Sequence, residues 1–201
     1  MGEKDLFQPL TKEDKISVFL YRAGIVISTI LIAVIAYMLF NASHYQADAA
    51  ISIKANIMLI LLYASVGTSV FFIHLYIGKF HKFLKRVYYI SIISLIILFV
   101  IGKGDIYWVL VNKTYSPLLL IPLAGCLGFI TAKEAFCFKL MEGYLLALIM
   151  PLYLLLLSTG AMTIKSASNW TIFIAAMLIL FTLRKVFMPI HYDIGDKSAY
   201  Q

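Results

Sequence analysis

Long apolar runs alternate with short polar segments along most of the chain. The runs are Ile16–Phe40, Asn56–Gly78, Val87–Ile101, Pro117–Ala132, Tyr144–Ile164 and Trp170–Ile190. A helix that crosses the hydrocarbon core of a bilayer needs about 20 mostly apolar residues. Val87–Ile101 is short by this measure unless Phe83–Arg86 form its first turn. The pattern predicts an all-α membrane bundle of six transmembrane helices.

The segments between the runs refine this picture. Gly102–Asp105 breaks the chain, and Ile106–Val111 is then expected to be a short interfacial piece with aromatic side chains at headgroup depth. The fourth run is expected to continue as a helix through Glu142 into the interface. We expect residues 1–15 to form an N-terminal tail, residues 16–190 a single six-helix domain, and residues 191–201 a C-terminal tail.

Composition agrees with a membrane protein and narrows the function classes. The chain is 62% hydrophobic and 13% charged, with a mean hydropathy of +0.92, whereas soluble domains are about 25% charged. These values exclude an ordinary soluble enzyme, a disordered protein and a disulfide scaffold. The net charge is +7, but the cations lie between apolar runs and form no basic face, so we expect no nucleic-acid partner.

The distribution of Lys and Arg predicts the orientation of the bundle. If the N-terminus is cytoplasmic, 13 of the 17 Lys and Arg residues lie on the inner side. The four on the outer side are Lys54, Lys103, Lys113 and Lys165. Cytoplasmic loops carry an excess of Lys and Arg. We therefore expect both termini in the cytoplasm and a multi-pass protein of the inner, or plasma, membrane.

In this orientation, polar residues that are distant in sequence meet at the cytoplasmic face. The candidate cluster consists of Arg22, His74, Lys133, Glu134, Cys137 and Glu142. His74 is expected in the last turn of the second helix. On one continuous helix, Glu134 and Glu142 share a face, and Lys139 can pair with Glu142. We expect both carboxylates to turn into the bundle, with His74 or Arg22 within reach of at least one.

Each member of this cluster has a structural and a functional interpretation. Arg22, Arg184 and Lys185 can simply snorkel to the interface, and His74 can be a hydrogen-bonded structural residue. The two carboxylates can form a structural ion-pair lock, relay protons or bind cations. Cys137 lies between two lysines, which could lower its thiol pKa, although an inert cysteine is the alternative.

Small residues recur along the fourth run. Ala124, Gly128 and Ala132 are spaced every four residues, and Gly125 is adjacent. Such a stripe allows two helix backbones to approach closely. It predicts that this helix is buried and central, and the role it implies is helix packing.

One block resembles a known family. The segment 131–138, followed by Glu142, Gly143 and the apolar run through Pro151, resembles a family of predicted integral membrane proteins from cyanobacteria, other bacteria and chloroplasts that is described as a domain of unknown function. The resemblance implies a membrane protein of about this size and no particular activity. It draws attention to the block residues Lys133, Glu134, Phe136, Cys137 and Glu142.

Catalytic signatures are missing from the sequence. It contains no HExxH motif, Gly-rich phosphate loop, GxSxG elbow or His/Cys cluster at zinc spacing, so we expect no enzyme, catalytic residue, metal or cofactor. The leading hypothesis is a non-catalytic accessory or assembly factor, or a small transport-type protein, in the lipid bilayer with a membrane-protein partner or a second copy. The alternative is an ion- or proton-coupled transporter that uses Glu134, Glu142 and His74.

Overall fold

The computed structural model describes residues 10–42, 49–75 and 77–194. Within these ranges the chain is helical and forms no strand. The elements are α1 (Lys12–Ala42), α2 (Ala49–Phe72), α3 (Gly78–Ile101), α4 (Ile106–Asn112), the 3-10 helix η2 (Ser116–Leu120), α5 (Ile121–Phe138), α6 (Met141–Ser158), α7 (Ile164–Val186) and α8 (His191–Ile194). Among the described residues, six helical segments are long and apolar enough to cross a membrane, with η2 and α5 together making the fourth. The predicted all-α, six-span architecture is confirmed.

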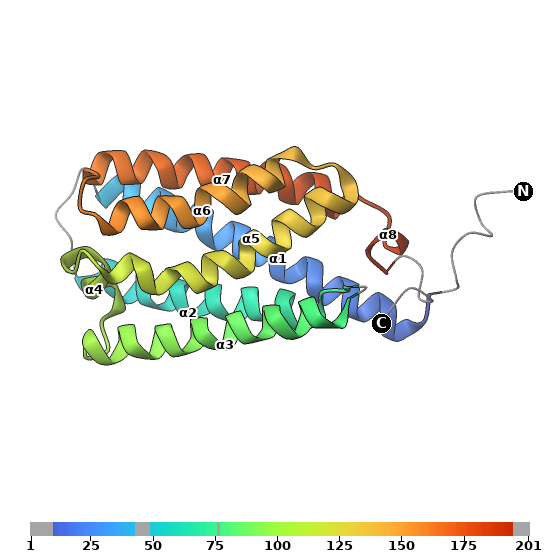
Figure 1. Ribbon diagram of the computed structural model, residues 1–201. Helices are drawn as coiled ribbons and strands as arrows, with labels where there is room; N and C mark the ends of the chain where they lie inside the picture. The colour runs from blue at the N-terminus through green and yellow to red at the C-terminus, as the bar shows by residue number, and fades with distance from the viewer. Residues whose placement is uncertain (1–9, 43–48, 76, 195–201) are drawn as a thin grey trace, which may run out of the picture.

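The contacts between the six long helices close into a ring. In this ring α1 contacts α2, followed by α3, α5, α6 and α7, and α7 contacts α1. Inside the ring α2 also contacts α5. The start of α1 and the short α8 lie at the same end of the bundle, on the right in Figure 1. We call this end the α8 end and the opposite end the α4 end.

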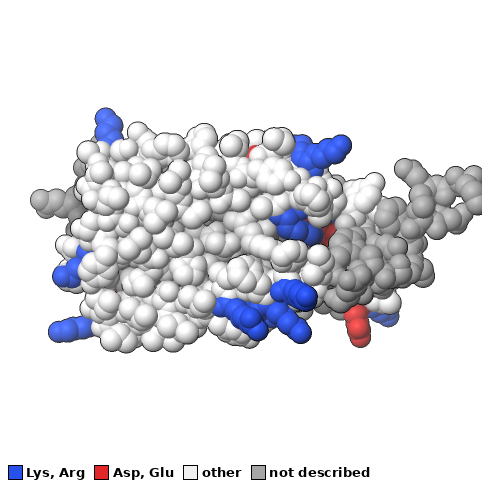
Figure 2. All heavy atoms as spheres, viewed as in Figure 1, with Lys and Arg blue, Asp and Glu red and all other residues white. Residues whose placement is uncertain are grey.

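Charged side chains gather toward the two ends of the bundle. On the face shown in Figure 2, Lys and Arg lie toward both ends, and a broad uncharged band separates them. Large apolar side chains are exposed all around the long helices, for example Ile93 on α3 and Leu148 on α6. An apolar outer surface is what a helix that faces lipid requires.

Several helix boundaries differ from the sequence predictions. α2 ends at Phe72, so His74 lies in the connection to α3 and not in the last turn of the second helix. α3 begins at Gly78, so the basic stretch from Lys79 to Arg86 is helical. This start gives the short third run the length to cross the bilayer, while its cations stay near the end of the bundle, where they can reach water. The predicted sixth span also starts earlier, at Ile164, where Thr163 caps α7 by accepting a hydrogen bond from the Ser166 amide.

The expected continuous helix from the fourth run to Glu142 is wrong. α5 ends at Phe138, Lys139 adopts a left-handed conformation with φ 54°, and α6 begins at Met141. Leu140, between the two helices, is completely buried. A continuing helix would carry the chain out of the bundle, whereas the reversal buries Leu140 and returns α6 beside α5.

The interfacial piece expected at Ile106–Val111 is the short helix α4. A turn through Lys103 and Gly104, both with positive φ, leads into it. Asp105 caps it by accepting a hydrogen bond of 2.9 Å from the Trp108 amide. Ile106 and Val109 are buried and Trp108 is exposed, so α4 lies against the end of the bundle with one apolar face inward.

The small-residue stripe lies on α5, which packs against the long helices α2, α3 and α6. A Cβ atom added to Gly128 would lie 3.3 Å from both the Cα and the carbonyl oxygen of Ala147 on α6. Ala124 is also buried, while Gly125 and Ala132 are half-buried. Gly128 is therefore the member of the stripe at which the α5 and α6 backbones approach closely.

Gly128→Leu is expected to lower the free energy of unfolding by about 1–3 kcal/mol, because a large side chain must push α6 away from α5. Thermal unfolding in detergent, followed by circular dichroism, measures this loss. A variant as stable as the wild type would show that α5 and α6 are not this close at Gly128.

Candidate functional site

The α8 end of the bundle contains a cluster of buried charged side chains, which we call the buried charge network. It joins four elements: α1, α5, α7 and α8. Its members are Tyr21, Arg22, Lys133, Glu134, Lys185 and Asp193. From Ile164 to Arg184, α7 rises about 30 Å at 1.5 Å per residue, which is about the thickness of the hydrocarbon core. The network therefore lies at the depth of one membrane edge, inside the protein.

Glu134 is contacted by side chains from three helices: α1, α5 and α7. Its side chain is completely buried. The Tyr21 hydroxyl donates to Oε1 at 2.6 Å, and Lys133 Nζ lies 2.7 Å from the same oxygen. Lys185 forms an ion pair with Oε2. Oε1 therefore accepts hydrogen bonds, whereas Oε2 has no hydrogen-bond partner among the described residues and is compensated by the charge of Lys185. A buried carboxylate requires such compensation.

Asp193 is the second buried carboxylate, and it ties α8 to the bundle. Arg22 reaches Oδ2 through Nε at 2.6 Å and Nη2 at 2.5 Å, and Lys185 pairs with Oδ1. The remaining Arg22 donors reach the backbone between α7 and α8, at the carbonyls of Val186 (3.0 Å), Met188 (2.6 Å) and Pro189 (3.2 Å). One guanidinium therefore fixes both the end of α7 and the position of α8.

Lys185 is the centre of the network because it pairs with both Glu134 and Asp193. It is completely buried, and its ammonium lies 4.1 Å from the centre of the Phe138 ring. A cation close to an aromatic face gains further stabilisation where water is excluded. Snorkelling was expected for Arg22 and Lys185, but both are buried and paired inside the bundle, so that expectation is wrong for these two residues.

Glu142 forms a separate ion pair with Arg184, the residue of α7 directly before Lys185. Arg184 Nη1 donates to both Glu142 oxygens, at 2.8 and 2.7 Å. Glu142 is buried, whereas the Arg184 side chain is 50% exposed. The expected common helix face is wrong because Glu134 and Glu142 lie on different helices, and Glu142 pairs with Arg184 in place of Lys139.

The two predicted partners of these carboxylates lie elsewhere. Arg22 binds Asp193 and is linked to Glu134 through Asp193 and Lys185. His74 Nε2 lies 3.2 Å from the Ser17 hydroxyl, on the opposite side of α1 from α7 in the ring. The structure therefore brings Arg22, Lys133 and Glu134 into one network, while Glu142 and His74 lie beside it.

His74 lines a cavity of about 250 Å³ with Ser17, Phe71 and His81. Its Nδ1 atom is buried and has no hydrogen-bond partner among the described residues. Burial and the positive charge of Lys133 lower the pKa of His74 from its ordinary value of 6.5, against the weaker opposing influence of Asp193 and Asp14. Protonation of His74 is thus less favourable in the folded protein than in the unfolded chain.

This lowered pKa predicts a loss of stability in mild acid. Between the folded pKa and 6.5 the unfolded chain binds more protons than the folded chain, so the free energy of unfolding falls as the pH falls through this window. His74→Gln removes the titration, and its thermal midpoint in detergent should fall less between pH 7.5 and pH 5.5 than that of the wild type. Equal losses in both proteins would contradict the prediction.

The two cysteines differ in environment. Cys126 is buried in the core, and Cys137 is exposed at the end of α5. Within residues 10–42, 49–75 and 77–194, no group of three or more His, Cys, Asp or Glu side chains is arranged to hold a metal ion.

Three members of the network were missed from the sequence: Tyr21, Lys185 and Asp193. Lys185 carried the clearest signal, because a lysine inside an apolar span must either reach the interface or find a partner. Asp193 was assigned to the tail, yet α8 packs on α1 and places it against Arg22. Tyr21 had no distinguishing signal within an aromatic-rich span.

The fold and the buried network define a multi-span helical membrane protein, and comparison with known families agrees. A family model described as uncharacterized integral membrane protein (DUF2301) matches residues 68–201. The chain belongs to this family, as the resemblance of the 131–142 block had suggested. No curated protein and no solved structure matches the chain.

Proposed function

We propose that this chain is a non-catalytic accessory or assembly protein of the inner membrane, in which the buried charge network acts as a permanent lock. The observation that carries the proposal is that the buried charges pair with one another across α1, α5, α7 and α8. Three cations and two carboxylates that satisfy each other in a desolvated site hold the helices in one arrangement, because separating any of them strands a buried charge.

A rigid bundle suits a protein that presents a surface to another membrane protein. Phe136 and Phe187, at the ends of α5 and α7, are 79% and 83% exposed. Both lie at the α8 end of the bundle, as does the basic start of α3. Exposed aromatic residues are enriched where proteins associate, which supports a membrane-protein partner or a second copy at this end.

The alternative is an ion- or proton-coupled transporter that uses Glu134, Glu142 and His74. One observation favours it: two histidines line the His74 cavity, and the positive charge of Lys133, a member of the network, lowers the pKa of His74. Against it, Glu134 is occupied by two lysines and a tyrosine, and a carboxylate that carries protons or ions must exchange its partners during each cycle.

Reconstitution separates the two functions. The wild type and Glu134→Gln are placed in liposomes that contain a pH-sensitive dye, and an outward or inward pH gradient, or a cation gradient, is applied. The lock proposal expects no flux above empty liposomes for either protein, together with a large loss of stability in the variant. Flux in the wild type that disappears in a folded Glu134→Gln variant would replace the proposal with the transporter.

Partners are identified from native membranes. The tagged full chain is purified in mild detergent beside a Phe136→Ser and Phe187→Ser double variant. The accessory role expects a stoichiometric membrane-protein partner, or a second copy, with the wild type and much less of it with the variant. A monomer without any partner in both preparations would contradict this role.

The orientation of the bundle remains a prediction, in which both termini face the cytoplasm. The structure places the four predicted outer lysines toward the α4 end and the described members of the larger set toward the α8 end, which supports the charge argument. Reporter fusions after Gln46 and after Lys82 should report opposite sides of the membrane, with Lys82 inside. Outside labelling of both positions would overturn the predicted topology.

A further inference from the structure

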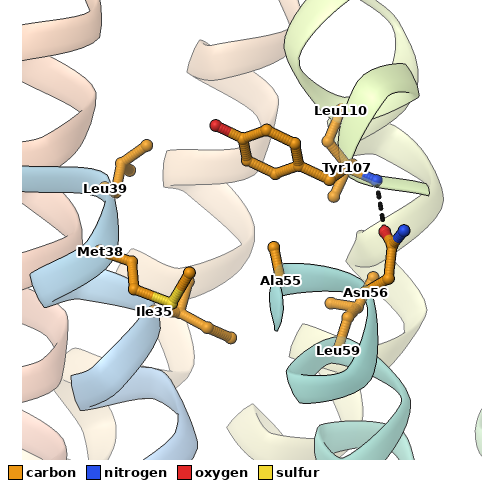
Figure 3. Close-up of a pocket in the computed structure, with 8 residues that line it drawn as sticks. All are labelled: Ile35, Met38, Leu39, Ala55, Asn56, Leu59, Tyr107 and Leu110. Atoms are coloured by element: carbon orange, nitrogen blue, oxygen red, sulfur yellow. Dashed lines mark hydrogen bonds between the residues drawn. The ribbon is translucent and has the colours of Figure 1, made fainter. Parts of the chain in front are cut away.

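The centre of the helix ring is hollow in the half of the membrane nearer the α4 end. A cavity of about 200 Å³ lies between α1, α2, α5, α6 and α7. Leu110 of α4 and Leu120 of η2 line its end nearest the α4 end of the bundle. A second cavity of about 90 Å³, between α1, α2 and α4, shares Ile35, Leu59 and Leu110 with the first. The two cavities therefore adjoin, and Figure 3 shows the smaller one.

The larger cavity has an apolar wall. Most of its lining side chains are Leu, Ile, Ala and Met. Its two polar residues, Tyr153 and Thr171, use their hydroxyls elsewhere: they lie 2.9 Å apart, and both donate to the Ala167 carbonyl, at 3.2 and 2.8 Å. An apolar cavity of about 150 Å³ stays free of water and takes up hydrocarbon ligands, so a larger one in a membrane protein favours a hydrocarbon occupant.

The smaller cavity, nearer α4, has two polar residues in its lining, Asn56 and Tyr107. The Tyr107 ring points across this cavity toward Leu39 of α1, above Met38, Ile35 and Ala55 (Figure 3). The Tyr107 amide donates to Asn56 Oδ1 at 2.8 Å, which is the dashed line in Figure 3. Tyrosine is a residue of the headgroup region, where its ring is in apolar surroundings and its hydroxyl is wet.

A polar network holds Tyr107 in this position. Asp105 accepts hydrogen bonds from Ser52 at 2.6 Å, from Asn56 at 3.3 Å and from the Trp108 amide at 2.9 Å. These bonds lower the pKa of Asp105, with the Ser52 hydroxyl as the largest cause. The network fixes α4 on the start of α2, and with it the aromatic side of the smaller cavity.

The depth of the cavities matches one half of a bilayer. From Ile164 to Ile174, at the deep end of the larger cavity, α7 rises about 15 Å at 1.5 Å per residue. Half of the hydrocarbon core is also about 15 Å thick. The adjoining cavities thus extend from the interface to the middle of the membrane, which is the path of one lipid chain in one leaflet.

We propose that the two adjoining cavities bind one hydrocarbon chain of a membrane phospholipid, with the polar part of the lipid at Tyr107 and the end of the chain near Ile174. The surrounding bilayer supplies this ligand at high concentration. Filling the cavity restores the contacts that the lining side chains lack when it is empty. The lipid then occupies the space between the two halves of the ring, where α1 and α2 face α6 and α7.

The proposal is tested by the lipid that remains with the purified protein. The full chain is expressed in its membrane, exchanged extensively into detergent, and analysed by native mass spectrometry and lipid extraction. Two variants fill the cavities: Ala124→Phe in the larger and Ala55→Leu in the smaller. Leu148→Phe is the matched control, because Leu148 on α6 is 65% exposed and faces away from the cavity.

The wild type and Leu148→Phe should retain about one phospholipid per chain, and each filling variant should retain at least fivefold less while its helix content is unchanged. If Ala124→Phe does not fold, Ala55→Leu decides. No retained lipid in the wild type, equal retention in a folded filling variant, or a retained ligand that is not a phospholipid would each overturn the proposal. Because the readout is bound lipid, its outcome is independent of the accessory and transport tests.

Discussion

Replacing Glu134 with Gln is expected to lower the free energy of unfolding by about 3–5 kcal/mol, because it removes one of two carboxylates that neutralise three buried cations. Lys133 and Lys185 then lose their shared partner, and Asp193 alone faces the positive charge. The amide keeps the size of the side chain, so the loss reports charge and hydrogen bonding. Equilibrium unfolding in detergent, followed by circular dichroism, measures it.

The balance of charges predicts a specific pattern in a double-mutant cycle. Lys185→Met alone leaves Glu134 with Lys133 and Asp193 with Arg22, so it should destabilise less than Glu134→Gln. The double variant, Glu134→Gln with Lys185→Met, has the net charge of the wild-type network. Its loss of stability should be at least about 1 kcal/mol smaller than the sum of the two single losses, since contacting residues couple by about 0.5–3 kcal/mol.

Glu142→Gln is the matched control for this cycle. Glu142 is also buried, but its partner Arg184 is half-exposed and can turn to water when the carboxylate is removed. Exposed ion pairs contribute about 0–1 kcal/mol, so the expected loss is about 1 kcal/mol. Equal losses for the two glutamates would contradict the assignment of Glu134 to a desolvated network.

The sequence predicts how many helices span the membrane, but it does not predict where each helix ends. The number of spans was predictable because crossing hydrocarbon imposes a run of apolar residues on every helix. The helix ends were not, since polarity at a membrane edge fits both a loop and a helix. The stretch from Lys79 to Arg86 looks like a loop and is helical, whereas Lys139 and Leu140 look like part of a helix and form a reversal.

The same limit applies to the candidate site. The sequence indicated that Glu134 and Glu142 need partners inside the protein, and both are buried and paired. It did not indicate which partners, because these depend on how the ring closes. Arg22 on α1 meets Asp193 on α8 only because α1 packs against α7, and neither apolar periodicity nor the local spacing of charges encodes that neighbour.

Glycines at helix contacts also depend on which helices become neighbours, and they give the second large prediction. The four-residue stripe on α5 pointed to close packing at Gly128, but two glycines outside the stripe lie closer to a neighbouring backbone: Gly143 of α6 against Thr131 of α5, and Gly24 of α1 against α2. A Cβ atom added to Gly24 would overlap the Ser69 hydroxyl and lie 2.7 Å from the Ser65 carbonyl oxygen and 2.9 Å from the Ser69 amide nitrogen. Ser69 also donates to the Tyr21 carbonyl at 3.1 Å, so the two backbones are joined where they meet.

Gly24→Ala is therefore expected to destabilise the protein by about 1–3 kcal/mol, because backbone atoms of α2 cannot move aside as a flexible side chain can. Gly125→Ala is the matched control on the predicted stripe. There the nearest atom to an added Cβ is Val87 Cγ1 at 3.9 Å, an ordinary contact, and alanine favours a helix by about 0.5–1 kcal/mol over glycine. The same unfolding measurement should thus give changes of opposite sign for two glycine-to-alanine substitutions within spanning helices. A gain in stability for Gly24→Ala would mean that α1 and α2 lie farther apart than the structure has them.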